Sequence, residues 1–440
     1  MGGDGKAVTM GNPLAGFTRA MRHGDYRRYT IASLCSNIGT WTHRVAIGWL
    51  TWQLTGSYAW LGIVAFTDLF AGMLAAPIAG ELADRMDRIK MSLWAQWAQL
   101  AQALAMAAMV FGGWIDRWSL LVLAVTFGIA HAYHASARLA VVPSLVPRED
   151  LTPAIAINSL IFNVSRFIGP AVAGVTIVNI GIAPAFVFNA VTFLYFIWVL
   201  TTIEVAVPEH QSGESGKTWA NIAQGVRYAT RHPGIGPILV ILGVTAFTVR
   251  ALPDLLPGFA DGVFGRGAAG LAWLTSAMGF GAVLSCMVLL SRESIRGMTR
   301  ITFASLLALG VTTLAFALTD SFWLAVLIAA GVGFSMNLSG VAALNLMQNA
   351  VDGEMRGRVM SIYFFLHQGA PALGTLAIGA VADKTGLGWP VGIAAGAIIV
   401  VWAVMVGRSA TLRDALEIEH PLPKAEGPKA EGRVGQDAKA

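Results

Sequence analysis

The stretch Gly80-Glu81-Leu82-Ala83-Asp84-Arg85-Met86-Asp87-Arg88-Ile89-Lys90 is the most informative part of the sequence, because it lies between two long apolar runs. These runs cover approximately residues 59–80 and 91–112. A helix needs about 20 mainly apolar residues to cross the roughly 30 Å core of a bilayer, so we expect two membrane-spanning helices joined by a short loop. The basic residues of the loop predict a cytoplasmic location, since Lys and Arg are retained on that side.

The same search over the whole chain finds twelve such runs. They cover approximately residues 29–53, 59–80, 91–112, 119–142, 153–177, 184–203, 235–256, 269–290, 301–318, 322–345, 357–380 and 389–407. The strands of a membrane β-barrel are about ten residues long and alternate in polarity, which excludes a barrel for these continuous runs. We therefore predict an all-α membrane protein with about twelve transmembrane helices.

Composition also indicates a bilayer environment. Hydrophobic residues make up 55% of the chain and charged residues 12%, whereas an average soluble protein has about 25% charged residues. The net charge is +5, but the basic residues form short clusters between apolar runs, so we expect lipid rather than nucleic acid as a partner. Cys35 and Cys286 lie in different runs, and no zinc-ligand pattern or phosphate-binding loop is found. We expect neither a metal nor a cofactor.

The chain divides into five parts by composition. We expect a cytoplasmic N-terminal segment (1–28), a six-helix bundle (29–203), a cytoplasmic linker (204–234), a second six-helix bundle (235–407) and a disordered cytoplasmic tail (408–440). Within the linker, apolar residues recur at helical spacing between Trp219 and Tyr228. This spacing predicts a helix on the inner membrane surface.

An internal repeat relates the two bundles. A shift of 205 residues aligns Gly128 with Gly333, Gly169 with Gly374, Gly174 with Gly379 and Gly181 with Gly386. Spans four and five therefore correspond to spans ten and eleven, as expected for a transporter built from two related six-helix halves.

The distribution of basic residues predicts the orientation. Of the 30 Lys and Arg residues, Arg117, Arg266 and Lys384 fall in outer loops, while Arg44, Arg166 and Arg250 fall within spans. The other 24 lie in or beside the segments that are cytoplasmic if the N-terminus is inside. We therefore expect both termini in the cytoplasm.

The loop from Gly80 to Lys90 resembles the signature loop of the major facilitator superfamily. That resemblance implies the major facilitator fold, with Gly80 packed against span eleven. It also implies a conformational latch in which Asp84 and its neighbours Arg85, Arg88 and Lys90 hold the cytoplasmic face when the carrier opens outward. Two positions depart from the family pattern: Asp87 replaces the usual glycine, and Ile89 replaces a common base.

Span five contains Gly169, Pro170 and Gly174 in a Gly-Pro-x-x-Gly order, which resembles a helix-packing motif of exporters in this superfamily. The stretches 37–41, 142–151 and 356–361 are similar to the branch that includes enterobactin exporters and macrolide-efflux proteins. Small residues and proline also serve plain helix packing, so the motif alone leaves both interpretations open.

Polar residues within the spans are candidates for a transport site, because an ionisable group in hydrocarbon is costly. The resemblance implies that spans one, four, seven and ten line a central cavity. Span one offers Asn37, Thr40 and Trp41 as cavity residues. His131, His134 and Arg138 share one face of span four, and Arg166 lies in span five. The face of span four could bind protons or an acidic substrate; alternatively, Arg138 snorkels to the interface while the two histidines bond to neighbouring helices. Arg166 is a further candidate for transport or coupling. For Arg250 and Asp254 in span seven we favour an i,i+4 pair near the outer surface.

Arg44 and Asp68 are the opposite charges that lie deepest in the first two spans. Each is 12 positions from Gly56 in the outer turn, so each sits roughly 18 Å below that turn, near the middle of the bilayer. They can meet if their helix faces agree. Protonation of Asp68 would then release Arg44 and couple a proton to helix movement, or the pair could simply hold the two spans together.

We expect a proton-driven exporter of small amphipathic or acidic molecules, of siderophore or drug type, that works by alternating access as a monomer in the inner membrane. A facilitator or importer of the same fold is the first alternative. A membrane-embedded enzyme or receptor is the second, although the sequence shows no cluster of catalytic residues or folded soluble domain.

The topology can be tested with reporter fusions at Gly213 in the linker and after Arg408. We expect both fusions to report a cytoplasmic location because of the strong bias in basic residues. A reporter active only in the periplasm at either position would contradict the predicted orientation.

Overall fold

The computed structural model describes residues 13–203, 218–290, 292 and 294–418, and almost all of this part is helical. The N-terminal bundle consists of α2 (Gly24–Thr55), α3 (Tyr58–Arg85), α4 (Arg88–Phe111), α5 (Arg117–Val141), α6 (Leu151–Asn179) and α7 (Ala183–Thr202). The C-terminal bundle consists of α9 (Ile235–Thr248), α10 (Leu252–Pro257), α11 (Gly267–Leu290), α12 (Met298–Leu318), α13 (Phe322–Ala350), α14 (Gly353–Thr385) and α15 (Gly388–Val406). The shorter helices α1 (Pro13–Ala20), α8 (Thr218–Arg231) and α16 (Ser409–Leu416) lie outside the two bundles.

Each of the twelve predicted spans matches a helix or, for the seventh span, a pair of helices, and most boundaries agree within a few residues. In the described part of the chain, ten segments are long and apolar enough to cross a membrane by length and composition. The remaining two spans, α2 and α4, are long enough but more polar. The face of α4 that is turned into its bundle carries Gln96, Gln99 and Gln102, all buried.

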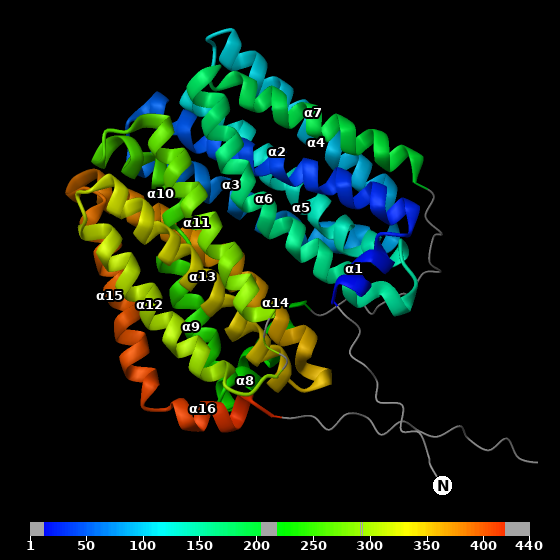
Figure 1. Cartoon of the computed structure of the whole chain (residues 1–440), viewed down its shortest axis with the longest axis vertical. Coiled ribbons are helices and arrows are strands. Elements are labelled where there is room, and N and C mark those ends of the chain that lie inside the picture. The colour runs from blue at the N-terminus through cyan, green and yellow to red at the C-terminus, as the bar shows by residue number, and fades with distance from the viewer. Residues whose placement is uncertain (1–12, 204–217, 291, 293, 419–440) are drawn as a thin grey trace, which may run out of the picture.

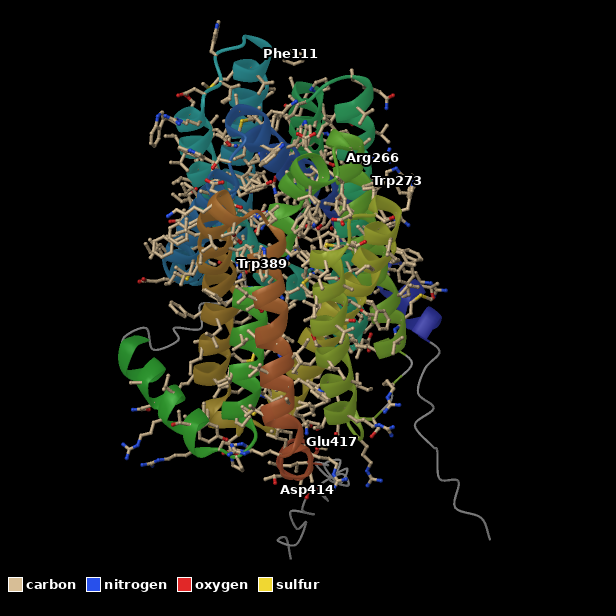
Figure 2. The ribbon with its side chains drawn as sticks, turned by 90° about the vertical axis from the view of Figure 1, so that its left-hand side faces the viewer. Phe111, Arg266, Trp273, Trp389, Asp414 and Glu417 are labelled. Carbon is tan, nitrogen blue, oxygen red and sulfur yellow. The ribbon has the colours of Figure 1, made fainter. Side chains whose placement is uncertain are left out.

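The two bundles come together beside α10 and diverge toward α1 and α16 (Figure 1). We call the end of the molecule at which α1 and α16 lie the near end, and the opposite end the far end. Asp414 and Glu417 mark the near end, and Phe111 and Arg266 lie at the far end (Figure 2). Exposed tryptophans lie toward both ends of the spans, with Trp273 and Trp389 at the far end and Trp94 and Trp198 toward the near end. Such a belt is typical of a membrane–water interface.

The glycines of the internal repeat have equivalent contacts in the two bundles. A Cβ atom on Gly128 would lie 2.1 Å from the carbonyl oxygen of Asp68, and one on Gly333 would lie 1.9 Å from that of Met278. Span four therefore packs on span two as span ten packs on span eight. In the same way Gly169 packs on α2 and Gly374 on α9. The repeat thus preserves the places where helix backbones approach most closely.

The next pair of the repeat joins the two bundles to each other. A Cβ on Gly174 of α6 would lie 2.0 Å from Cβ of Ala272 on α11, and one on Gly379 of α14 would lie 2.4 Å from the carbonyl oxygen of Tyr58 on α3. Both contacts lie at the far end. Gly181 and Gly386, the last pair, both have positive φ angles, +106° and +76°, in the turns that follow α6 and α14.

Asp87, the departure from the family pattern, begins α4. Its carboxylate accepts hydrogen bonds from the backbone N–H groups of Ile89 and Lys90 at 2.9 and 3.3 Å. A side chain that caps the free N–H groups of a first helical turn stabilises the helix by about 1 kcal/mol. The substitution for glycine therefore has a structural role of its own.

Span seven differs from the prediction of one continuous helix over 235–256. The helix α9 ends at Thr248, α10 begins at Leu252, and a wide turn follows over Gly258–Val263. Pro253 has no N–H to donate, and the N–H of Arg250 donates to the carbonyl oxygen of Thr245, five residues back. This break removes the regular i,i+4 spacing between Arg250 and Asp254.

The segments outside the bundles are more ordered than expected. The predicted helix in the linker is present as α8, which packs on α14, while residues 204–217 lie outside the described residues. The tail was predicted to be disordered from residue 408, but its first part forms the helix α16. Glu417 follows this helix and accepts hydrogen bonds at 2.8 Å from the backbone N–H groups of Gly297 and Thr299 at the start of α12. This contact fixes the tail, because a carboxylate is favourable at the positive end of a helix. Residues 419–440 lie outside the described residues.

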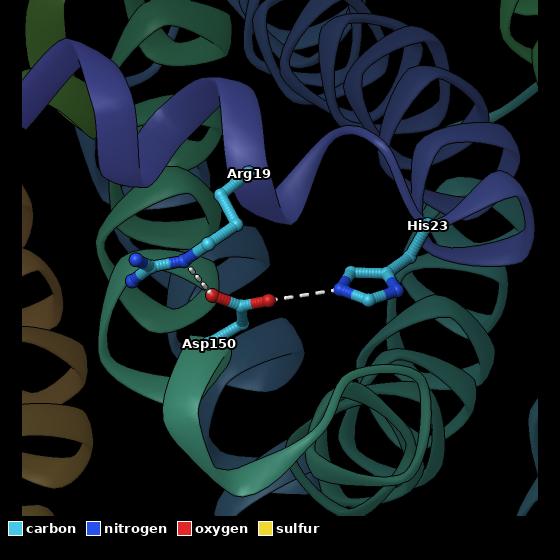
Figure 3. A network of polar contacts seen from close by, with 3 residues as sticks. All are labelled: Arg19, His23 and Asp150. Carbon is cyan, nitrogen blue, oxygen red and sulfur yellow. Dashed lines mark hydrogen bonds and ion pairs between the residues drawn. The ribbon is translucent and has the colours of Figure 1, made fainter.

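A polar network fixes the N-terminal segment. Asp150, which is buried at the start of α6, accepts hydrogen bonds from Arg19 and from His23, the latter at 2.8 Å (Figure 3). These bonds, with that from His23 as the largest contribution, hold the pKa of Asp150 below its usual value. The segment before α2 is thus attached to the near end of the N-terminal bundle.

Candidate functional site

A cavity of about 560 Å³ lies between the two bundles. Its lining combines apolar side chains with five charged ones: Arg44, Asp68, Arg166, Arg250 and Asp254. The cavity draws residues from both halves of the chain, so its shape depends on how the bundles sit against each other. A pocket with an apolar wall and a few polar groups is the usual form of a small-molecule site.

Arg44 and Asp68 form an ion pair in the wall of this cavity, with Nη1 of Arg44 2.9 Å from Oδ2 of Asp68. The guanidinium also lies over the ring of Phe127, 5.6 Å from its centroid. The close approach of Gly128 to the backbone of Asp68 brings α3 against α5 at this level. The second oxygen, Oδ1 of Asp68, is buried without a hydrogen-bond partner among the described residues. The contact between Arg44 and Asp68, which their equal depth in the first two spans made possible, is therefore present.

The structure separates the candidates on spans one and four. Asn37, Thr40, Trp41 and His131 line the cavity, but His134 and Arg138 are not among its described lining residues. The Nδ1 atom of His134 lies 3.1 Å from Nε2 of Gln96 inside the N-terminal bundle. The guanidinium of Arg138 lies over the ring of Phe162 at 5.9 Å. The helix face shared by these residues thus turns from the cavity into the bundle toward the near end.

Span five supplies both the predicted packing motif and a cavity residue. Gly169 lies against Trp41 and Ile38 of α2. Gly174 lies against α11, and Pro170 lines the cavity. Arg166, one turn before Pro170, places its guanidinium over the ring of Trp41, 5.4 Å from the centroid.

Three ionisable residues that sequence reasoning did not place in the site also line the cavity: Arg250, Asp254 and His367. The preference for an Arg250–Asp254 pair near the outer surface was wrong, because the break after α9 changes their relative direction. No ion pair between the two occurs within the described residues. Their position within an apolar run was the signal that could have identified them.

Of the predicted latch, the structure describes the surroundings of Gly80, Arg88 and Lys90. A Cβ on Gly80 would have nothing within 4 Å, so this glycine does not pack closely against span eleven here. The side chains of Asp84 and Arg85 lie outside the described residues. Nη1 of Arg88 lies 3.5 Å from Oγ of Ser144, and Lys90 is exposed. The role of these residues as a latch stays a prediction.

The far end, in contrast, is closed by contacts between the bundles. Asp383 at the end of α14 accepts hydrogen bonds from Oγ of Ser57 at 2.8 Å and from the backbone N–H groups of Tyr58 and Ala59 at 2.7 and 3.2 Å. Nε1 of Trp52 donates to Asp261 at 2.8 Å. Close contacts at glycines join the bundles only from the far end down to Met73 and Gly369 in the described chain. The contacts described at glycines therefore hold the bundles together on the far-end side of the cavity.

The order Gly379-Ala380-Val381-Ala382-Asp383-Lys384 could have revealed this contact. This order at the far end of span eleven repeats the pattern of Gly80 to Arg85, which lies at the near end of span two. The carboxylate of Asp383 lies at the start of α3, where the free N–H groups and the helix dipole favour negative charge.

A model of the transmembrane secretion effector family matches residues 15–437. The chain belongs to this family of major facilitator transporters. Among curated relatives, the multidrug efflux pump Tap of Mycolicibacterium fortuitum is 26% identical over 379 residues, which cover 83% of this chain and 91% of Tap. The enterobactin exporter EntS of Escherichia coli O81 (strain ED1a) is 25% identical over 337 residues, which cover 75% of this chain and 76% of EntS.

Solved structures support the fold of this chain. A bacterial homologue of the iron transporter ferroportin, in an inward-facing state, has a TM-score of 0.66 at 16% identity, covering 88% of this chain and 98% of its own. A bacterial homologue of the lysosomal transporter Spinster has a TM-score of 0.68 at 12% identity, covering 89% of this chain and 96% of its own. The family match makes the protein a multi-pass membrane transporter, and these structures show that it has the major facilitator fold. In the described residues, no three His, Cys, Asp or Glu side chains gather as a metal site.

The far-end closure can be tested with Asp383→Asn. Loss of a carboxylate from a helix N-terminus costs about 0.3–1 kcal/mol, so we expect the population open at the far end to rise up to about fivefold. A cysteine at Thr51, which lines the cavity, should then react faster with a membrane-impermeant maleimide added from the far side.

Asp116→Asn is the matched control, because Asp116 accepts a hydrogen bond from the backbone N–H of Ser119 at the start of α5 without joining the two bundles. An unchanged labelling rate in Asp383→Asn, or an equal rise in Asp116→Asn, would contradict the assignment of Asp383 as a far-end closure.

Proposed function

We propose that the protein is a proton-coupled exporter of drug or siderophore type in the inner membrane, that it works as a monomer, and that its near end faces the cytoplasm. The orientation rests on the basic residues of the near-end segments. Export rests on the exporter-like packing motif of span five and on the similarity to Tap, an efflux pump, and EntS, an exporter.

The observation that carries proton coupling is the Arg44–Asp68 ion pair in the wall of the cavity. Asp68 is a carboxylate that can take up a proton, and its ionised form is stabilised by Arg44. When Asp68 binds a proton the attraction ends, and Arg44 becomes an unpaired charge that must find water or another partner. The two helices that hold the pair also carry the far-end turn at Ser57, so a change in the pair can reach the closure made by Asp383.

The cavity supports a transport cycle by alternating access. The far-end contacts give way and the near end closes, so that a substrate taken from the cytoplasm is released outside. The predicted latch around Asp84 would hold the near end closed, as Asp383 holds the far end. Each end would then use a carboxylate at a helix terminus, and the proton on Asp68 would change the balance between the two closures.

The test is Asp68→Asn in proteoliposomes with an imposed pH gradient. The variant keeps the shape of the side chain and cannot ionise, so we expect pH-driven accumulation to be lost while exchange down a substrate gradient continues. Asp320→Asn, in the exposed loop before α13, makes the same chemical change away from the cavity and should behave as the wild type.

Normal pH-driven transport by Asp68→Asn would show that the proton site lies elsewhere. If the single variant fails to fold, the charge-swapped double variant Arg44→Asp/Asp68→Arg decides the question. Full recovery of pH-driven transport in the double variant would mean that the pair is purely structural.

A further inference from the structure

The charges that line the cavity do not balance. Three arginines and two aspartates face it, which leaves one positive charge in excess while the histidines are neutral. The charges of Arg44 and Asp68 offset each other in their ion pair. Arg166, Arg250 and Asp254 remain, and neither of these two arginines forms an ion pair within 4 Å in the described part of the chain.

The two unpaired arginines belong to opposite bundles. Arg166 lies on α6 in the N-terminal bundle, where its backbone contacts α11 at Gly279. Arg250 lies at the break between α9 and α10 in the C-terminal bundle. They repel each other electrostatically, while Asp254 attracts Arg166. A single carboxylate cannot neutralise both arginines, so the cavity can accept an additional negative group.

A guanidinium presents N–H donors in a plane that matches the two oxygens of a carboxylate or a similar anion. An anionic group between the bundles would also relieve the repulsion between Arg166 and Arg250. That repulsion opposes closure of the bundles around an empty cavity. Binding of an anion would therefore favour the occluded form.

We propose that Arg166 and Arg250 together bind the anionic group of the substrate, and that the substrates are amphipathic organic anions. This inference rests on the proposed transport function and specifies its substrate class. The rest of the substrate meets an aromatic wall, because Trp41 and Phe162 pack edge to face at 5.8 Å and both line the cavity with Tyr363. An aromatic or otherwise apolar acid fits this combination. In the proposed orientation, the inside-negative membrane potential itself favours outward movement of such an anion.

The proposal can be tested by equilibrium binding to the purified protein, without a pH gradient. Fluorescein and rhodamine 123 share a xanthene frame but carry opposite charge, and fluorescence anisotropy measures the affinity of each. We expect the wild type to bind fluorescein more tightly than rhodamine 123. Arg166→Gln and Arg250→Gln should each weaken fluorescein binding about tenfold or more and leave rhodamine 123 binding equal or tighter.

Two further variants distinguish an effect of charge in the cavity from a general loss of folded protein. Asp254→Asn removes the competing carboxylate and should tighten fluorescein binding. Arg117→Gln, at an exposed arginine at the far end of α5, removes the same charge outside the cavity and should change neither affinity.

Equal or weaker binding of fluorescein than of rhodamine 123 by the wild type would overturn the proposal, as would unchanged fluorescein affinity in both arginine variants. The result is independent of the coupling mechanism. If fluorescein binds through the two arginines but a pH gradient drives no transport, proton coupling fails and the anion site stands. If a pH gradient drives transport of rhodamine 123 alone, the anion site fails and proton coupling stands.

Discussion

A charged side chain inside an apolar helical bundle needs a partner or water, and this constraint shapes the centre of the protein. The long spans supply an environment in which an unpaired guanidinium is costly. Arg44 is paired with Asp68 at 2.9 Å, whereas Arg166 and Arg250 face the same cavity without such a partner in the described residues. In the mechanism that we propose, this contrast between an ion pair and two unpaired arginines gives the cavity separate places for a proton and for a substrate.

Close packing of small residues then determines how this charged centre is enclosed. Gly128 and Gly333 let spans four and ten cross spans two and eight, and Gly174 and Gly379 let the bundles meet at the far end. The contacts within each bundle join helices that stay packed together. The contacts between the bundles at the far end also include hydrogen bonds of Asp383, which water can replace. The bundles are therefore suited to move as rigid bodies while their ends open and close.

Much of this arrangement could be predicted from the sequence, because the signals are one-dimensional. Apolar run length identifies the spans, the 205-residue shift identifies the repeat, and counting from Gly56 places Arg44 and Asp68 at one depth. The direction in which a side chain points around its helix axis is harder to predict. Arg250 and Asp254 were misplaced because a local break sets where they point, and His134 turns away from the cavity although His131 faces it. The contact of Asp383 with α3 joins residues 325 positions apart. The order Gly379 to Lys384 could have marked Asp383 as a contact residue, but it does not name the partner helix.

In the proposed cycle, the protonation state of Asp68 controls which end of the cavity is open. Paired spin labels measure this most directly, with Met86 and Gln348 as an exposed near-end pair and Phe111 and Leu318 as an exposed far-end pair. On acidification the account predicts that one distance lengthens as the other shortens in the wild type, and that neither responds to pH in Asp68→Asn. Distances that stay constant or change in the same direction in the wild type, or a pH response that persists in Asp68→Asn, would contradict it.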